Sequence, residues 1–433
     1  MTQEKDWLDD AFTAIAIDDD GRACRDIPDS ACKEEAGNFF THAGALSLSK
    51  SADALIDPKL VLSWLMTALG APALAGLLVP IRESGALLPQ LFTAGALRRL
   101  PRRKWAWAAG AVAQGLGAFM IALAAVTLEG AAAGWAILAA LAFLALARSV
   151  CSVSYKDVLG KTVDKSRRGR ATGLAGSVAA GAAIVFALIL TSGFFDRMSL
   201  VIAAIILAGL AWVAGGLLFT TLTEEKGAAE GGANAFTAAM DNFSYLRTER
   251  QLQRFIATRA LLTATALAPP FMVAAGASEG AAYGELGLLV LASAGAGLIS
   301  SFVWGRLSDK SSRKVLILSA TIGAGVLAVA AALAYAGALT GAFLLPVLLF
   351  VLMIAYQGVR LGRSTHLVDM ASEETRAAFT ALSNTVIGIV LIAGGVFSLV
   401  ASLAGPGAVL AIMAAMCAGA AFTGRGLDEV QAD

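Results

Sequence analysis

Twelve apolar segments, each about as long as a lipid bilayer is thick, restrict how this chain can fold more than any other feature. A membrane-spanning helix needs about 20 mostly apolar residues. The apolar runs and the breaks between them place the segments at roughly 38–63, 71–97, 104–127, 132–157, 170–194, 199–221, 252–276, 282–304, 314–336, 340–362, 377–402 and 405–423. The first two contain charges and prolines and are the least regular. The pattern predicts an all-α integral membrane protein with twelve transmembrane helices.

The composition excludes several classes of protein. Charged residues make up only 15% of the chain, whereas a soluble domain carries about 25%, so this is not a soluble enzyme with one large core. The formal net charge of +1 indicates no nucleic-acid partner. There is no catalytic triad pattern, nucleophile elbow or GxxxxGK[ST] motif. We therefore expect neither an enzyme nor an ATP-driven pump.

Few residues in the chain are suited to binding a metal ion. Cys24 and Cys32 lie in the polar N-terminal segment at a spacing that fits no common zinc motif, while Cys151 and Cys417 lie in apolar runs. The only two histidines are far apart in the sequence. We expect no metal site, no cofactor and no structural disulfide.

Basic residues gather on one side of the predicted spans. They lie in RRLPRRK (98–104), KTVDKSRRGR (161–170), the 222–254 linker and GRLSDKSSRK (305–314). The opposite connections are nearly free of Lys and Arg, with only Lys59 and Arg197 close to that side. Cytoplasmic loops are enriched in Lys and Arg, so both termini are predicted to be cytoplasmic. Abundant Ala and Gly favour a bacterial inner membrane as the location.

The longest polar interruption divides the spans into two sets of six. The predicted organisation is a cytoplasmic acidic tail (1–37), an N-terminal six-helix bundle (38–221), a cytoplasmic linker (222–251), a C-terminal six-helix bundle (252–423) and a cytoplasmic tail (424–433). In the first tail Trp7, Leu8, Ala11, Phe12 and Ile15 recur at helical spacing. This tail is either a short amphipathic helix or a loosely ordered solvated segment.

Two loops are repeated at nearly equal offsets. GALRRLPRRKW begins at Gly95 and aligns with GRLSDKSSRKV, which begins at Gly305, an offset of 210. SRRGRATGLAGS (166–177) aligns with ETRAAFTALSNT (374–385), an offset of 208. Internal repeats of this kind are typical of transporter folds.

At these residues the chain resembles the major facilitator superfamily of transporters. GRLSDKSSRK is similar to that family's loop between the second and third helices of a six-helix half, with Gly305, Asp309, Arg313 and Lys314 at the motif positions. The first-half copy departs from it, because Arg99 occupies the Asp position. The resemblance covers about residues 38–423. It implies two six-helix bundles with a substrate site between them.

The same resemblance implies a gating role for the loop. In the family this motif is associated with stabilising the outward-facing state. Gly305 would permit a tight turn and close helix approach. Asp309 would cap a neighbouring helix or pair with an arginine, Arg363 being the candidate. An ordinary positive-inside loop is the alternative, and it explains the arginines but not the repeated Gly and Leu.

Three charges interrupt the first apolar segment, in SLSKSADALIDPKL (47–60). Lys50, Asp53 and Asp57 fall on one helical face. An ionisable side chain at bilayer depth costs about 2.5–3.5 kcal/mol on insertion scales and is a functional candidate by default. The stripe is therefore predicted to face a water-filled cavity.

Other segments supply charged partners: Arg82 and Glu83 lie in the second segment and Arg148 in the fourth. The resemblance implies that the first and fourth helices line the cavity, and that an acid on one and an arginine on the other are similar to proton-coupled members. Asp53 is then the leading proton carrier.

For several of these residues a second interpretation stays open. Lys50 and Asp53 are alternatively a static ion pair, and Asp57 a solvated helix end. Glu83 either carries protons or pairs structurally. Arg360 either meets an anionic substrate or belongs to the positive side of the protein.

The helix backbone offers two further signals. Pro269 and Pro270 in the seventh segment predict a kink. The Gly-Pro pair that many drug antiporters of the family carry in the fifth helix is absent here, so the direction of transport stays open.

These observations predict a secondary active transporter of a small solute that works by alternating access and is driven by protons. Its expected partners are the solute, protons and the lipid bilayer, and we expect a monomer. The alternative is a transporter-like membrane protein that acts in assembly or sensing without transport, with the tail as its contact surface. The sequence does not indicate which solute is carried.

Overall fold

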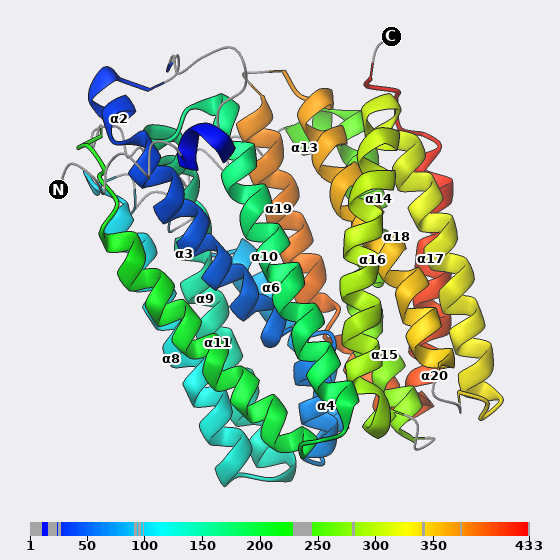
Figure 1. Ribbon diagram of the computed structural model, residues 1–433. Helices are drawn as coiled ribbons and strands as arrows, with labels where there is room; N and C mark the ends of the chain where they lie inside the picture. Colours follow the sequence, from blue (N-terminus) through cyan, green and yellow to red (C-terminus); the bar gives the residue numbers. More distant parts are fainter. Residues whose placement is uncertain are drawn as a thin grey trace.

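The computed structural model describes residues 11–15, 24, 27–90, 93, 97, 99–227, 245–278, 282–339, 343–372 and 375–431, excluding the side chains of 278, 282–285, 301, 302, 309 and 377. The described residues form helices and no strand (Figure 1), as the sequence predicts. Trp7, Leu8 and most of the predicted linker 222–251 lie outside these residues.

The first half of the fold contains six helical spans, of which the first two are broken. They are α3 (Glu35–Leu55) with α4 (Val61–Ala68), α5 (Pro72–Ala75) with α6 (Leu78–Leu87), α8 (Lys104–Thr127), α9 (Gly130–Thr162), α10 (Lys165–Ser192) and α11 (Arg197–Thr220). The short helix α2 (Asp29–Lys33) precedes them.

The second half repeats this layout after the short helix α13 (Tyr245–Thr248). Its helices are α14 (Arg250–Leu262) with α15 (Ala264–Ser278), α16 (Ala282–Lys310), α17 (Ser312–Tyr335), α18 (Leu344–Met370), α19 (Arg376–Ala393) and α20 (Val396–Gly424). Gly405, with φ 81°, interrupts α20. Its first part therefore completes the eleventh span, and its second part is the twelfth.

Length and apolarity support membrane crossing for most of these spans. Eight described helices are long and apolar enough to cross a membrane, and the apolar stretches Leu286–Ser300 and Ala378–Ala393 are shorter. The two remaining spans are the broken ones at the start of the chain, which contain charges. The predicted all-α fold of twelve spans in two bundles is confirmed.

The predicted uninterrupted span 38–63 is wrong, because the first helix breaks near the middle of the protein. α3 ends at Leu55, and Pro58 has no N–H with which to continue it. Asp57 Oδ1 accepts hydrogen bonds from the N–H groups of Lys59 (2.8 Å) and Leu60 (3.1 Å), and the helix resumes as α4. The span ends at Ala68, so residue 57 is far from a helix end at the membrane surface.

The seventh span is also discontinuous. It breaks at Thr263, between α14 and α15, and Pro269 and Pro270 lie within α15. A proline lacks the backbone N–H donor, and its ring clashes with the preceding turn. The break at Thr263 lies on this N-terminal side of the two prolines.

The start of α3 and the end of α20 lie at the same end of the bundle, which we call the termini end (Figure 1). The basic connections 161–170 and 305–314 lie there too, because α9, α10, α16 and α17 meet at them. We call the opposite end the far end. The predicted orientation would place the termini end in the cytoplasm.

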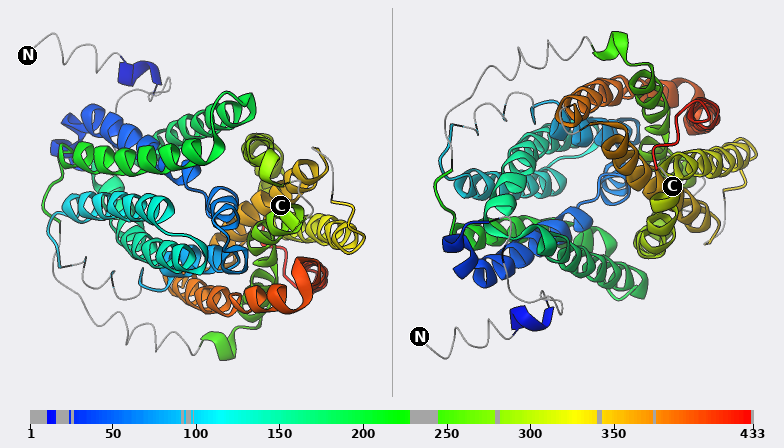
Figure 2. Two further views of the ribbon diagram at one scale, coloured as in Figure 1. Left: turned by 90° about the horizontal axis from the view of Figure 1, so that it is seen from below. Right: turned by 90° about the horizontal axis from the view of Figure 1, so that it is seen from above.

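Each half has its own apolar core, and the two halves meet at the far end. The first core contains Trp212 and Leu141, and the second contains Leu410 and Met413. Leu286 from α16 of the second half is packed into the first core. Figure 2 shows the two groups of helices along the bundle axis.

Close packing of α10 against α16 requires a glycine at position 287. A Cβ on Gly287 would lie 2.5 Å from Thr191 Cγ2 and 2.9 Å from the carbonyl oxygen of Ala187. Small residues let membrane helices approach closely. The far end is thus sealed by direct contact between the two halves.

At the termini end, the third helix of each half is capped in the same way. A side-chain oxygen from the segment after the last helix of that half accepts hydrogen bonds from the N–H groups at its start. Glu224 accepts hydrogen bonds from the N–H groups of Arg103 (3.0 Å) and Lys104 (2.8 Å) at the start of α8. In the second half, Gln431 accepts from the N–H of Ser312 (2.8 Å) at the start of α17. The predicted internal repeat therefore extends to the way in which the two bundles are closed.

The expectation of no structural disulfide is wrong, because Cys24 and Cys32 are joined by one. α2 turns the chain back so that this pair lies beside Glu35, whose carboxylate binds Arg167 at 2.6 Å. Disulfides are uncommon in the cytosol. The bond therefore favours a non-cytoplasmic location for this segment, whereas the distribution of Lys and Arg predicts a cytoplasmic one.

The described part of the tail packs on the protein itself. Residues 11–15 are helical, and Phe12 is buried against Phe39 with ring centroids 5.4 Å apart. Arg167 lies over the Phe12 ring at 5.6 Å. On the predicted apolar face, Phe12 is covered by the first half, whereas Ile15 is exposed.

Replacing Glu224 with Ala is expected to destabilise the first half. The carboxylate is fully buried, and it also contacts Lys161 Nζ at 3.3 Å. Removing one member of a buried ion pair costs about 3–5 kcal/mol. The Tm of the detergent-purified protein should fall by several degrees, whereas Ala at exposed Glu225 should leave it unchanged. Equal Tm values for both variants would contradict this role.

Candidate functional site

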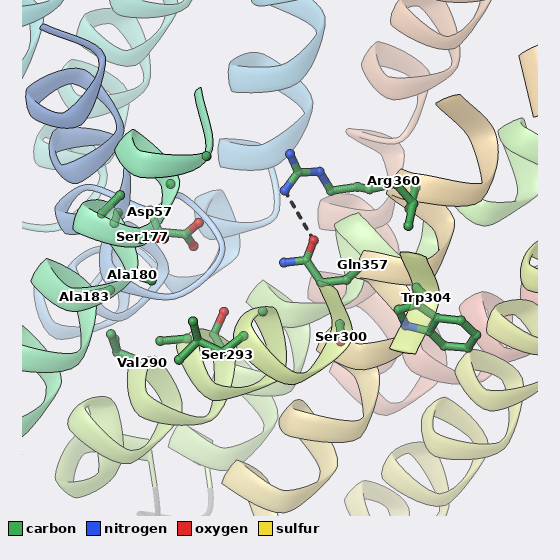
Figure 3. Close-up of a pocket in the computed structure, with 18 of the residues that line it drawn as sticks. Asp57, Ser177, Ala180, Ala183, Val290, Ser293, Ser300, Trp304, Gln357 and Arg360 are labelled. Atoms are coloured by element: carbon green, nitrogen blue, oxygen red, sulfur yellow. Dashed lines mark hydrogen bonds between the residues drawn. The ribbon is translucent and has the colours of Figure 1, made fainter. Parts of the chain in front are cut away.

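A cavity of about 920 Å³ lies between the two halves. Its walls come from the broken α3–α4 span, α10, α16 and α18. Asp57, Ser177, Ser293, Gln357 and Arg360 are among its polar lining residues. Figure 3 shows Asp57 and Ser177 on one side, with Gln357 and Arg360 facing them from the other.

The cavity extends from the middle of the bundle toward the termini end. Gly173 and Ser364, which line it, lie about two turns from the termini ends of α10 and α18. Val290 and Ala183 line its inner part, beyond which the halves are in contact. The protein therefore has a conformation closed at the far end, with its cavity directed to the termini end.

Asp53 forms the most compact charged cluster next to this cavity. Its Oδ1 contacts Arg82 at 2.6 Å and its Oδ2 contacts Arg148 at 2.6 Å. The carboxylate thereby joins the first, second and fourth spans of one half. The sequence predicts these three residues as cavity charges; the structure brings them together, but the residues that line the cavity do not include them.

Lys50 does not pair directly with Asp53, so the interpretation of a static Lys50–Asp53 ion pair is wrong. Its Nζ donates to the carbonyl oxygen of Thr172 in α10 at 2.9 Å. Lys50 remains within electrostatic range of Asp53, Arg148 and Arg360.

Asp57 is not a solvated helix end, because it caps the break within the first span and faces the cavity. Next to it, Lys59 is buried and donates to the hydroxyl of Tyr356 in α18 at 2.9 Å, with Nζ 4.1 Å from the ring centroid. The sequence predicts Lys59 close to the far side of the membrane. It instead links the two halves in the interior.

Glu83 lies among cations but forms no ion pair with the described residues. Lys59, Arg82, Arg363 and Arg360 are all within its electrostatic range. Arg82 has its partner in Asp53. The two adjacent residues thus have different surroundings.

Arg259 in α14 is a buried interior charge that the sequence analysis missed. Its guanidinium donates to Ser383 Oγ at 2.6 Å and to Asn384 Oδ1 at 2.9 Å, both on α19. Its Nε has no hydrogen-bond partner in the described structure. The signal was present, since Arg259 interrupts the apolar run 252–276.

The loop motif does not contain the predicted tight turn at Gly305. Gly305 is helical within α16, and a Cβ there would have no atom within 4 Å. Arg313 donates to the carbonyl oxygen of Arg425 at the end of α20, at 2.9 Å. The Asp309 side chain lies outside the described structure, and Arg363 forms no hydrogen bond with any described residue.

One group of metal-ligand atoms occurs in the described residues. The ligand-type atoms of Cys24, Cys32 and Glu35 lie within 4.8 Å of one another. The two sulfur atoms are bonded to each other, and the carboxylate binds Arg167. This arrangement is a structural cluster and does not suit a cation.

Cysteines placed along the cavity should report which end is open. In a variant with Ser at positions 24 and 32, Ser177→Cys and Ser364→Cys should react readily with a maleimide in detergent. Ala75→Cys, buried at the far-end interface, should stay unreactive, and native Cys151 and Cys417 are buried. Preferential reaction at position 75 would indicate the opposite conformation.

No family model and no curated protein sequence matches the chain. Solved structures do match it. A nucleoside transporter, NupG, has a TM-score of 0.65 at 14% identity over 90% of this chain and 98% of NupG. A D-xylose-proton symporter has a TM-score of 0.66 at 13% identity, covering 91% and 99%. A POT family transporter in complex with a thioalcohol-conjugated peptide has 0.66 at 9%, covering 89% and 94%.

These similarities show the fold. The chain has the major facilitator fold that the repeated loops indicated, and the alignments cover nearly the whole length of each structure.

Proposed function

We propose that the chain is a secondary active transporter that carries a small solute by alternating access. The single observation that carries this proposal is the charged cavity between two six-helix halves that are in contact at the far end. The structures that share the fold are transporters of nucleosides, peptides and xylose.

The contacts at the far end are of a kind that allows the two halves to separate there. The two halves meet there through small residues and apolar side chains, with Gly287 against α10. The contact between Lys59 and Tyr356 also joins the halves. Breaking these contacts while closing the termini end would expose the same cavity to the other side of the membrane.

The termini-end motif is proposed to act in the second state. Gly305 has open space beside it here, as a residue should if its neighbour arrives only on closure. Asp309, Arg313 and Arg363 lie on the helices that would approach. Arg313 meanwhile holds the end of α20 in place.

Asp53 is the proposed proton carrier. A proton on either oxygen would remove the charge that Arg82 and Arg148 share. Proton binding and the two ion pairs therefore compete. Movement of either arginine during the cycle would change the proton occupancy of Asp53, and Lys50 and Glu83 would modulate the same field.

The alternative function in assembly has less support. Its proposed contact surface was the apolar face of the tail, and Phe12 on that face is buried against the first half of the same chain.

Asp53→Asn should abolish solute accumulation driven by a pH gradient in proteoliposomes. Asn has nearly the same size as Asp, but its amide cannot bind and release a proton as a carboxylate does. Exchange of labelled for unlabelled solute across the membrane should persist, because it needs no net proton movement. Asp196→Asn is the control, since exposed Asp196 only caps α11, where Asn serves equally well. Wild-type accumulation by Asp53→Asn would refute the assignment.

A further inference from the structure

The interior of the two bundles contains more cations than carboxylates. The described interior carboxylates are Asp53, Asp57 and Glu83. The cations are Lys50, Lys59, Arg82, Arg148, Arg259, Arg360 and Arg363. This leaves an excess of four positive charges, in a part of the protein where each uncompensated charge is costly.

The carboxylates do not neutralise the cations evenly. Asp53 is shared by two arginines, and Asp57 is committed to backbone N–H groups at the helix break. Glu83 lies within electrostatic range of Lys59, Arg360 and Arg363 but pairs with none of the described residues. The hydrogen bonds that the remaining cations donate within the described structure go to neutral oxygens. Lys50 binds a carbonyl oxygen, Lys59 a phenol hydroxyl and Arg360 the side-chain amide of Gln357 at 3.4 Å.

The second half has interior arginines but no interior carboxylate among its described residues. Arg259 is 7% exposed, binds only a hydroxyl and an amide oxygen, and has an unpartnered Nε. Arg363 lies within its electrostatic range. Like charges at this depth repel one another strongly because the surrounding dielectric constant is low, so this arrangement favours the arrival of an anion.

Arg360 connects this unbalanced charge to the cavity. It is exposed to the cavity and faces Asp57 and Ser177 across it (Figure 3). Lys59 and Arg360 both lie near the ring of Tyr356, at 4.1 and 5.9 Å from its centroid. Lys50 of the first half is within electrostatic range of Arg360. Arg360 lines the cavity, and Lys50 and Lys59 lie beside residues that line it: Lys50 Nζ is 3.8 Å from where a Cβ on Gly176 would be, and Lys59 is in the segment between Asp57 and Leu60.

We infer that the transported solute is a small anion bearing a carboxylate or phosphate group, held between Arg360 of the second half and Lys50 and Lys59 of the first. This inference rests on the proposed transport function. Guanidinium and ammonium groups form their strongest hydrogen bonds with such oxyanions. An anion that bridges both halves would also draw them together, as closure of the termini end requires.

The test uses pools of probe solutes and two readouts on the full chain. The anionic pool contains succinate, citrate, benzoate and glucose 6-phosphate. The uncharged pool contains glucose, uridine and glycerol, and a cationic pool contains tetraethylammonium and spermidine. At constant ionic strength, each pool is added to purified protein to measure Tm, and to proteoliposomes containing a pH-sensitive dye to measure proton flux.

The anionic pool alone should raise the Tm and start proton flux. Arg360→Gln should weaken the apparent affinity for that pool by about tenfold or more, since it removes a charged hydrogen-bond donor. Arg376→Gln removes the same charge from an exposed position of α19 and should behave as wild type. Arg259→Lys should retain part of the affinity lost by Arg259→Gln.

The outcomes separate the two claims. Proton flux with the uncharged or cationic pool only would overturn the anion assignment and leave the transport function intact. A rise in Tm with anions that depends on Arg360, without flux from any pool, would support the anion site and count against transport. A rise in Tm that is equal in wild type and Arg360→Gln, or absent for every anion, would overturn the anion assignment.

Discussion

A charge held inside a membrane protein is costly unless it is paired, and in this fold Asp53 is paired with both Arg82 and Arg148. It fixes three spans of the first half around one carboxylate. Lys50, one turn away, donates to the backbone of α10.

The broken first span is the second feature on which the cavity depends. Asp57 supplies the cap that lets the helix restart after Pro58, and the break directs Lys59 to Tyr356 in the other half. Irregular backbone within a membrane protein is tolerated where it is buried or lines a cavity. Here it does both, and it supplies a polar contact between halves that are otherwise joined by apolar packing.

Much of the fold follows from the sequence, because a bilayer imposes one length and one polarity on every span. The ends of α8 agree with the predicted 104–127, and the repeated loops lie at one end as expected. Asp53, Arg82 and Arg148 could be identified as interior charges because an ionisable residue in an apolar run is a clear signal, although the cavity is lined by other residues. Their mutual pairing was not predictable, since it depends on how three helices rotate against one another.

The errors have specific physical causes. Lys59 was placed at the far side because the run 38–63 seemed long enough for a whole span, whereas the break at Asp57 makes the span longer. The Cys24–Cys32 disulfide was not predicted, because the spacing of the two cysteines matches no motif and only the fold brings their sulfur atoms together. Gly305 was expected in a turn, but α16 continues to Lys310 and the turn comes after it.

The central claim is that the two halves rock about the charged interior. It is tested most directly by spin-label distances at both ends, with one pair at positions 165 and 310 at the termini end and another at 194 and 403 at the far end. The account predicts two populations of distances for each pair. A change of pH or an added anion that shortens the distance at one end should lengthen the distance at the other end. A single unchanged distance at both ends under all conditions would contradict it.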